Sequence, residues 1–525
     1  MESCTTRKRI SERQVKKLNT SLDTIPAIVI LVIALYFVLN AVIIRRFHVT
    51  QDNIEQFSVG GRKFGWLLVV FTYMGAWYVG ATYTGWVASG ADIGMFALYL
   101  GIYSIGGMVT MYFMASNVWI WGKVYQLNTV TDLINLRYQS PAYGNFFTVI
   151  VLLVNFFWLV VEMITIGYVF MVATNAVIDF KLGIIIGSVF VLVYTFFGGA
   201  RGSAIGSVVQ GTTFVIAGAI VFFVLMQVSY GGPVGLFEMI EMHKPELLSL
   251  ESSRGLWMSS IITGIFGAYC WPQVFNRIYM GNGPRESKKA VLIAPIMVVI
   301  ITCGILWNAM GLTMLDGLPV DHQTGLFWLA NKYLGPLALG FVGVFAITAC
   351  MSTISAVSHS IGVMVGGQFL TKEHHSELRK VKNMKYSLAV VCIMAIAVAL
   401  FDFQNLNFVA LSMYQFIIQA FVPLFFGIIW KRGNVRGAFF GMTAGIMIAM
   451  IGFLGPDYLF DWAGGLNAGC VGLVVNFVIY WICAQVYGKP KWCDELWESL
   501  KLYDEKGRYI GKEPENLKGR NKILK

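Results

Sequence analysis

The sequence predicts an all-α integral membrane protein with about 13 transmembrane helices, folded as a five-plus-five inverted repeat with two discontinuous helices. The first observation behind this prediction is composition. Only 13% of the 525 residues are charged and 57% are hydrophobic, whereas soluble domains carry about 25% charged residues. The second is a series of apolar runs of about 19 residues or more, long enough to cross a bilayer as helices. The third is the interruption of two of these runs by glycine or proline.

The low charge content excludes a soluble enzyme, a nucleic-acid-binding protein and a secreted disulfide scaffold. The eight cysteines are scattered singly, without zinc-type spacing. We expect a basic head at 1–22, one transmembrane transporter domain at 23–487 and a cytoplasmic tail at 488–525, with no fused soluble module. The core repeats are expected at about 64–228 and 257–430. No enzymatic activity is expected, because no catalytic set of residues gathers at either membrane face.

Apolar segments can be placed along the whole chain between short charged loops. The expected spans are 25–44, 64–90, 94–116, 144–177, 182–200, 203–228, 257–276, 290–314, 334–366, 386–401, 405–430, 437–455 and 465–487.

The distribution of Lys and Arg predicts the orientation, because cytoplasmic loops are enriched in these residues. Alternate loops form two sets that hold 29 and four basic residues. The rich set includes the tail, so we expect a multi-pass protein of the plasma (inner) membrane with a cytoplasmic C-terminus and an extracellular N-terminus. The head carries six basic residues and favours the opposite side. If the first span lay in the membrane interface, both termini would be cytoplasmic.

The second span is interrupted by glycine. Gly75, Gly80, Gly85 and Gly90 recur every five residues, which distributes them around the helix and not along one packing stripe. Glycine weakens a helix, so we expect a break here, of the kind that is tolerated at membrane depth where it lines a cavity. A plain kinked helix is the simpler alternative.

The seventh span contains Gly264, Gly267 and Pro272. Proline removes a backbone donor and clashes with the preceding turn, which predicts a second break near 267–272. The two interrupted spans lie five apart and run in opposite directions across the membrane. This pattern is typical of inverted-repeat transporters, whose binding site lies at the midplane between the two broken helices.

Glu162, in the fourth span, is the only carboxylate in the middle of a predicted span. An ionisable residue at this depth is costly and is by default a functional candidate. It could act as a proton-linked coupling group, or it could be a buried carboxyl group that is hydrogen-bonded to a neighbouring helix. The sequence leaves both roles open.

The ninth span contains a run of hydroxyl residues within Thr348–Ser355. Hydroxyl and carbonyl oxygens suit a hard monovalent cation, and no thiolate or imidazole set is present for a transition metal. The alternative is that these hydroxyls bond the carbonyl one turn back, as Ser and Thr commonly do in helices.

Two loop segments have recognisable patterns. Gln56–Arg62 fits Phe-x-x-(Ala/Gly)-Gly-Arg, and Thr129–Tyr138 fits Thr-x-x-(Asp/Glu)-x-(Leu/Ile)-x-x-Arg-(Tyr/Phe). The second segment also predicts a short helix that is capped by Thr129, with Asp132 three residues later.

Three further segments follow in order. They are Gly198-Gly199 with Gln210, Pro272-Gln273 with Arg277 and Ser287–Ala290, and Ala349–Ser355 with its Ser-Thr pair. Together, the five segments resemble the sodium–solute symporter family, and the similarity runs from about Gln56 to Gln485. The resemblance implies a leucine-transporter-like inverted repeat. It also implies sodium-coupled import of a small organic solute by alternating access, the solute being an amino acid, pantothenate, a carboxylate or a sugar or polyol.

The resemblance also implies a sodium site, and no other cofactor. Ser352 and Thr353 would contribute hydroxyl oxygens, and Ala349 its carbonyl. The carbonyls from the broken second span fall, by register with the glycines, on Gly75 and Tyr78. A slip of one residue would shift these two to the following positions, Ala76 and Val79.

The sequence departs from the family pattern before Gln210, where Thr-Asp is common and Gly206-Ser207 stands here. That carboxylate is associated with cation coupling in several members, so its absence puts a second ion in doubt. Glu162 is then the remaining midspan carboxylate. The residue after Gly198-Gly199 is usually larger and apolar, and here it is Ala200.

Candidate solute contacts are Trp77, Tyr83, Trp271 and Gln419, of which the three aromatics could equally serve packing. The expected partners are thus a small-molecule solute, sodium and the lipid bilayer, with no nucleic acid. Two alternatives stay open: a proton-coupled carrier of the same fold, and a solute sensor or receptor built on a symporter domain. A sensor would need an output module, and the tail is too short for one.

Overall fold

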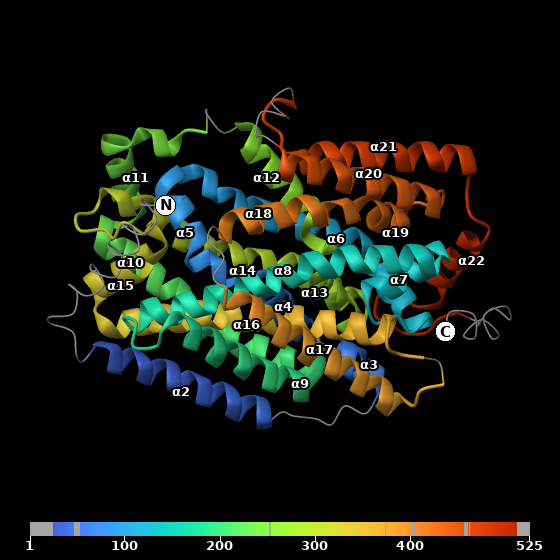
Figure 1. Cartoon of the computed structure of the whole chain (residues 1–525), viewed down its shortest axis with the longest axis horizontal. Helices are drawn as coiled ribbons and strands as arrows, with labels where there is room; N and C mark the ends of the chain where they lie inside the picture. The colour runs from blue at the N-terminus through green and yellow to red at the C-terminus, as the bar shows by residue number, and fades with distance from the viewer. Residues whose placement is uncertain are drawn as a thin grey trace.

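The computed structural model describes residues 25–46, 53–250, 254–372, 374–401, 406–455, 460 and 463–511. The predicted basic head at 1–22 lies outside these residues. Within them the chain is helical and has no named strand, although isolated bridges join Phe64 to Gly281 and Tyr503 to Tyr509. The long helices run along the long axis of the molecule (Figure 1). The predicted all-α membrane class is therefore confirmed.

In the described part of the chain, ten helices are long and apolar enough to cross a membrane. They are Pro26–Arg46, Gly85–Val124, Pro141–Ala173, Phe180–Tyr230, Pro284–Met314, Pro336–Gln368, Glu377–Ala399, Ser412–Ile429, Val435–Leu454 and Ala468–Tyr487. Gly85–Val124 covers parts of the second and third expected spans, and Phe180–Tyr230 covers the fifth and sixth. The interrupted seventh span is not among the ten. The count of 13 stays a prediction, as does the division into head, transmembrane domain and tail.

The individual helices have the following bounds. They are α2 Ile25–Arg46, α3 Ile54–Val59, α4 Trp66–Trp77, α5 Gly85–Ile93, α6 Tyr99–Val124, α7 Val130–Tyr138, α8 Pro141–Ala173, α9 Phe180–Thr212, α10 Ala219–Tyr230, α11 Gly232–His243, α12 Arg254–Gly267, α13 Pro272–Phe275, α14 Pro284–Gly311, α15 Gly325–Leu334, α16 Pro336–Gln368, α17 Glu377–Ala399, α18 Leu406–Ile417, α19 Gly427–Ile429, α20 Val435–Leu454, α21 Ala468–Tyr487 and α22 Trp492–Glu498.

The first predicted break is confirmed. Helix α4 stops at Trp77, and Tyr78 and Val79 are extended, with ψ angles of 112° and 152°. A short 3-10 turn at Gly80–Tyr83 then leads into α5. The carbonyls at the end of α4 lose their helical partners and are free to face a ligand.

The second predicted break is also confirmed. Helix α12 ends at Gly267, a 3-10 turn follows at Ala268–Cys270, and Trp271 is extended, with a ψ angle of 117°. Pro272 is then the first residue of α13. At this position its missing N–H costs nothing, because the N–H groups of the first helical turn have no acceptor within the helix. The proline thus starts a helix instead of kinking one.

Gly199 interrupts the regular helix between the fifth and sixth expected spans. Its backbone has φ 50° and ψ −146° within α9, a conformation that is open to glycine and strongly disfavoured for other residues. Gly198-Gly199, one of the segments that resemble the family, therefore marks a kink in α9.

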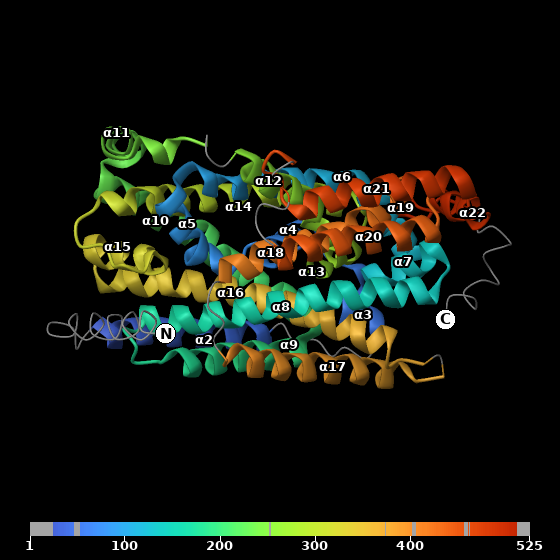
Figure 2. The ribbon, with the colours of Figure 1, turned by 45° about the horizontal axis from the view of Figure 1, so that its top comes forward.

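Helix α16 lies at the centre of the bundle. It contacts α8, α9, α17, α2 and α4, and α8 runs beside it in both views (Figures 1 and 2). Residues 342–364 of α16 are buried throughout. A helix that is enclosed on every side can carry polar groups only if they have protein or ligand partners, and this constraint makes its Ser and Thr residues informative.

The described part of the tail packs against the helix ends beside the C-terminal label of Figure 1. The Trp121 indole donates a hydrogen bond to the Leu496 carbonyl (2.8 Å), and the Trp492 indole donates to the Arg137 carbonyl (3.0 Å). Lys288 forms an ion pair with Glu505 at 2.9 Å. The sequence pattern marked this segment only as polar and gave no sign of its docking.

Candidate sodium and solute site

The first break brings α4 against α16. The Thr353 hydroxyl lies 3.2 Å from the Tyr78 carbonyl oxygen and 3.2 Å from the Ala349 carbonyl oxygen, and it can donate to only one of them at a time. All three residues are buried. Three of the five residues expected to hold sodium therefore meet around one point, where the carbonyl of the broken helix faces the middle of α16.

The remaining two expected ligands lie against each other. A Cβ atom at Gly75 would lie only 2.2 Å from the Ser352 hydroxyl oxygen, so the backbone of α4 comes closer to α16 than any larger residue would permit. The Ser352 hydroxyl is buried and has no hydrogen-bond partner in the structure. A buried hydroxyl without a partner needs an explanation such as a bound ion. The oxygen set around it fits a hard cation.

Ser207, which stands where the family often has Asp, faces the same place. Its hydroxyl oxygen would lie 2.5 Å from a Cβ at Gly75, and it donates to the Ser203 carbonyl at 2.9 Å. The position therefore borders the ion site, but it supplies a neutral oxygen that is already engaged with its own helix.

Glu162 reaches the first break from α8. Its Oε2 accepts a hydrogen bond from the Gly80 N–H at 3.0 Å. Its Oε1 is buried and has no hydrogen-bond partner, and no described basic residue pairs with it. Of the two roles left open by the sequence, the structure shows the hydrogen bond to a neighbouring element. That element is the first break, so a role of Glu162 in coupling stays open.

Cys350 meets the same break from α16. A Cβ at Gly80 would lie 2.0 Å from the Cys350 sulfur and 3.1 Å from Glu162 Oε2. Gly80 is therefore required for this close approach. Since Cys350 follows Ala349 in the chain, Glu162 and the expected ion ligand Ala349 both approach the same short segment at the first break.

Five aromatic residues gather between the two breaks, and we call them the aromatic cluster: Trp77, Tyr103, Trp158, Trp271 and Tyr414. The rings of Trp158 and Trp271 are 5.2 Å apart, and both contact Tyr414, at 5.9 and 5.4 Å. The Tyr103 ring joins Tyr414 to Trp77, at 5.9 and 5.6 Å. Trp77 and Trp271 were expected from the sequence, and both belong to this cluster.

The other two expected solute contacts lie elsewhere. Tyr83 contacts Tyr78 and Phe222, on the side of the break that faces α10. The Gln419 amide donates to the Gly469 carbonyl at 2.9 Å and lies beside Asn476 of α21. Gln419 therefore joins the 3-10 turn Ile418–Ala420, which follows α18, to α21, and its printed contacts do not include the aromatic cluster.

Tyr103, Trp158 and Tyr414 were missed from the sequence. Trp158 lies one turn before Glu162, so both side chains project from the same face of α8, and this spacing was a usable signal. Tyr103 is one of three tyrosines of the apolar helix α6, and Tyr414 is the one tyrosine of α18. Only the packing of α6 and α18 against the breaks distinguishes them.

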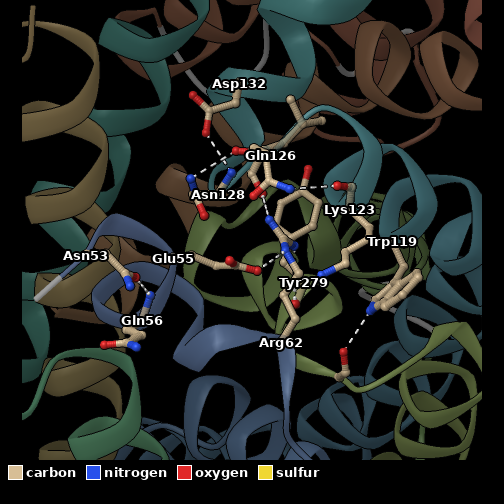
Figure 3. Close-up of polar contacts among 12 residues, drawn as sticks. Asn53, Glu55, Gln56, Arg62, Trp119, Lys123, Gln126, Asn128, Asp132 and Tyr279 are labelled. Carbon is tan, nitrogen blue, oxygen red and sulfur yellow. Dashed lines mark hydrogen bonds and ion pairs between the residues drawn. The ribbon is translucent and has the colours of Figure 1, made fainter. Parts of the chain in front are cut away.

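A second polar region lies at the end of the bundle and is drawn in Figure 3. Arg62 forms an ion pair with Glu55 at 3.0 Å, donates to the Leu127 carbonyl and lies over the Tyr279 ring. Asp132 accepts from the backbone N–H of Thr129 at 2.9 Å, and the Thr129 hydroxyl accepts in return, so the predicted capping of α7 is confirmed. Burial raises the pKa of the Asp132 carboxyl group.

Arg137, at the end of α7, is buried and binds the end of α19. Its guanidinium donates to the carbonyls of Gly427 (2.6 Å), Trp430 (3.0 Å) and Gly433 (3.0 Å). The adjacent Tyr138 donates to the Pro423 carbonyl at 2.6 Å. The Arg-Tyr pair of the loop pattern therefore joins this loop to the eleventh span.

Comparison with known proteins agrees with this architecture. Residues 57–445 match the sodium:solute symporter family. The uncharacterized symporter YhjB of Bacillus subtilis is 26% identical over 84% of this chain and 93% of the relative. The sodium/proline symporter of Staphylococcus aureus is 24% identical over 88% of this chain and 93% of its own. A solved Na+-coupled sialic acid symporter has a TM-score of 0.70 and 18% identity, over 89% of this chain and 98% of that chain.

Proposed function

The chain belongs to the sodium:solute symporter family, and from that premise we propose that it imports a small organic solute together with sodium by alternating access. It is a multi-pass membrane transporter and not an enzyme. The observation that carries the sodium proposal is the meeting of Thr353, Ala349 and Tyr78 at the first break.

In this proposal, sodium binds the hydroxyls of Thr353 and Ser352 and the carbonyls of Ala349, Tyr78 and Gly75. Every one of these ligands is a neutral oxygen dipole. Unwound carbonyls at a broken helix are typical cation ligands in inverted-repeat transporters. The ion would bond α16 to the end of α4, and it would thereby favour the arrangement in which the break is closed against α16.

Binding of the solute between the two breaks would then complete the coupling. The ion site touches Tyr78 and the aromatic cluster begins at the adjacent Trp77, so movement of α4 changes both sites together. A ligand shifts a conformational equilibrium only by its difference in affinity for the two states. A site shared between α4 and α16 has this property, because relative movement of the two helices pulls its ligands apart.

A proton could replace sodium as the coupling ion, with Glu162 as its carrier. The specific observation in favour is the unpartnered Oε1 of a buried carboxylate at the break. We place this second because the oxygen donors of α16 and Tyr78 have no role in a proton-driven cycle. The sensor alternative gains no support from the described tail, which forms one short helix and turns packed on the transporter.

The proposed orientation in the plasma membrane has the tail in the cytoplasm and the N-terminus outside. Its support is the distribution of 29 and four basic residues between the two sets of loops. Protease treatment of right-side-out vesicles should then spare a tag at the C-terminus and remove one at the N-terminus.

The test of function is uptake into proteoliposomes under an imposed sodium gradient or an imposed proton gradient. The panel should contain labelled proline, pantothenate, lactate, glucose and choline. We expect at least one solute to accumulate under the sodium gradient and to stop when that gradient is collapsed. Accumulation that follows the proton gradient alone would contradict sodium coupling, and it would require Glu162 for transport.

A further inference from the structure

We propose that the transported solute carries an alkylammonium group, which the aromatic cluster and the Glu162 carboxylate bind between the two breaks. This inference rests on the proposed transport function and names the solute class of that same site. Its first support is an unbalanced charge. Glu162 is the only charged residue of α8, and α16, opposite it, contains no Lys, Arg, Asp or Glu.

Only one of the two oxygens of the Glu162 carboxylate has a hydrogen-bond partner in the described part of the chain. The Gly80 N–H of the break bonds Oε2, whereas Oε1 is buried and has no hydrogen-bond partner among the described residues. A buried charge is costly unless it is paired. The expected sodium ligands meet at Tyr78, Ala349 and Thr353, and Glu162 is not among them, so in this proposal its second oxygen is left for another cation.

The aromatic cluster reaches the same face of α8 as Glu162 through Trp158. Trp158 precedes Glu162 by one helical turn, and the Tyr414 ring contacts both Trp158 and Trp271. The ring planes of these contacts meet at 88° and 72°. Tryptophan and tyrosine faces attract cations within about 6 Å, and cages of such rings recognise quaternary ammonium groups.

One further polar group of the cluster has no partner. The indole N–H of Trp271, at the second break, is buried and unbonded. It is a donor, so it can bind a hydroxyl or carboxylate oxygen elsewhere on the same solute. Trp77, by contrast, already donates to the Ser104 hydroxyl at 2.9 Å. A solute with an ammonium group and one nearby oxygen would occupy both unpaired groups.

The same features disfavour the other solute classes. A simple carboxylate would meet Glu162 as a like charge, with no described Lys or Arg of α8, α16 or α18–α19 to bind it. A sugar needs several hydrogen-bonding groups, and the cluster offers few that are unpaired. We therefore expect affinity to fall from alkylammonium compounds, through zwitterions, to neutral and anionic solutes.

The experiment measures binding of labelled choline to the purified full-length protein in detergent, at saturating and at zero sodium. Unlabelled glycine betaine, proline, pantothenate, lactate and glucose serve as competitors. We expect choline to bind, glycine betaine to compete more weakly, and the last three to have no effect. The inference would be overturned if choline did not bind and if pantothenate, lactate or glucose instead stabilised the protein against heat.

Two pairs of variants locate the site. Glu162→Gln keeps an acceptor for the Gly80 N–H and should weaken choline binding by about tenfold or more, whereas Glu241→Gln on the exposed face of α11 should not change it. Trp158→Leu should weaken binding similarly, whereas Trp481→Leu on the exposed surface of α21 should not. Trp158→Phe keeps an aromatic face and should recover part of the loss. Equal binding by Glu162→Gln and wild type would overturn the role of the carboxylate.

The same data separate this inference from the proposed function. Choline binding that does not depend on sodium would contradict sodium coupling and support the alkylammonium site. Sodium binding without choline binding would contradict the alkylammonium site and leave the sodium site intact.

Discussion

The two polar regions of this protein differ in how their groups are paired. At the end of the bundle, Arg62 has Glu55 and backbone carbonyls, and Arg137 holds the carbonyls that end α19. At the breaks, Ser352 and the Glu162 Oε1 are buried with no protein partner. Both regions are built from family motifs, so the presence of a motif alone does not distinguish them. The end region also holds buried unbonded atoms, among them Arg137 Nη1 and Asn128 Oδ1, but its charged groups have protein partners, whereas Glu162 has no ion pair with any described basic residue. This difference in charge pairing indicates that the first region holds the fold and the second binds ligands.

Removal of Arg137 should have the largest effect, and the effect should be on stability. Arg137→Met leaves the carbonyls of Gly427, Trp430 and Gly433 without their charged donor. Each buried unsatisfied acceptor costs about 1–3 kcal/mol, so we expect a loss on the order of 3 kcal/mol or more. The thermal unfolding midpoint in detergent should fall strongly, and Arg137→Lys should recover part of it.

The variant that remains folded should bind sodium with unchanged affinity. If the Arg137→Met protein that is still folded bound sodium more weakly than wild type, the end region would be a binding element, and the distinction between the two regions would fail.

Gly75→Ala should have the next largest effect, and the effect should be on binding. The added Cβ would meet the Ser352 hydroxyl at 2.2 Å. Forcing an atom into a packed site costs about 1–3 kcal/mol, which corresponds to a loss in sodium affinity of about five- to 150-fold. The control is Gly65→Ala at the start of α4, where nothing lies within 4 Å of the new Cβ. Sodium titration of thermal stability measures both variants, and equal affinities would contradict the site.

Loss of the α7 cap should have a smaller effect. Thr129→Ala removes the hydroxyl that accepts from the Asp132 N–H, and loss of such a cap costs about 1 kcal/mol. The unfolding midpoint should fall slightly, while sodium and solute affinity stay the same. Thr129→Ser keeps the hydroxyl and should behave as wild type. A lowered sodium affinity in Thr129→Ala would show that the two regions are coupled.

The pH dependence of Asp132 should be the smallest effect. Burial raises the pKa of this carboxyl group above its ordinary value of 3.8, so the folded protein holds the proton more tightly than the unfolded chain. Its contribution to stability is present below that value and is lost as the pH rises through the raised pKa. The stability of wild type relative to Asp132→Asn should therefore decrease with rising pH from about 4. A difference that increases with pH would contradict this sign.

The sequence predicted the features that depend on local chemistry. Gly75, Gly80 and Pro272 weaken or start helices wherever they occur, so the two breaks followed from their positions. The Thr129–Asp132 capping box is equally local. The lack of other charges in the spans was sufficient to single out Glu162.

The remaining features depend on contacts between distant segments. The hydrogen bond from Gly80 N–H to Glu162 joins residues 82 positions apart, and no local pattern encodes it. Tyr103 and Tyr414 meet only because α6 and α18 pack beside the breaks. Gln419 was a reasonable solute contact by its isolation among apolar residues, but its amide bonds α21 instead. The docking of the tail on Trp121 and Arg137 also depends on contacts between residues that are far apart in the sequence.

The most direct test of the account is binding of radioactive sodium to the purified protein. Wild type should bind sodium saturably, and the double variant Ser352→Ala with Thr353→Ala should lose this binding. The matched control is Thr174→Ala at the C-cap of α8, a buried threonine that also bonds the carbonyl one turn back and lies twelve residues beyond Glu162. The account predicts that this control binds sodium as wild type does. Unchanged sodium binding by the double variant would contradict the assignment of the ion to the first break.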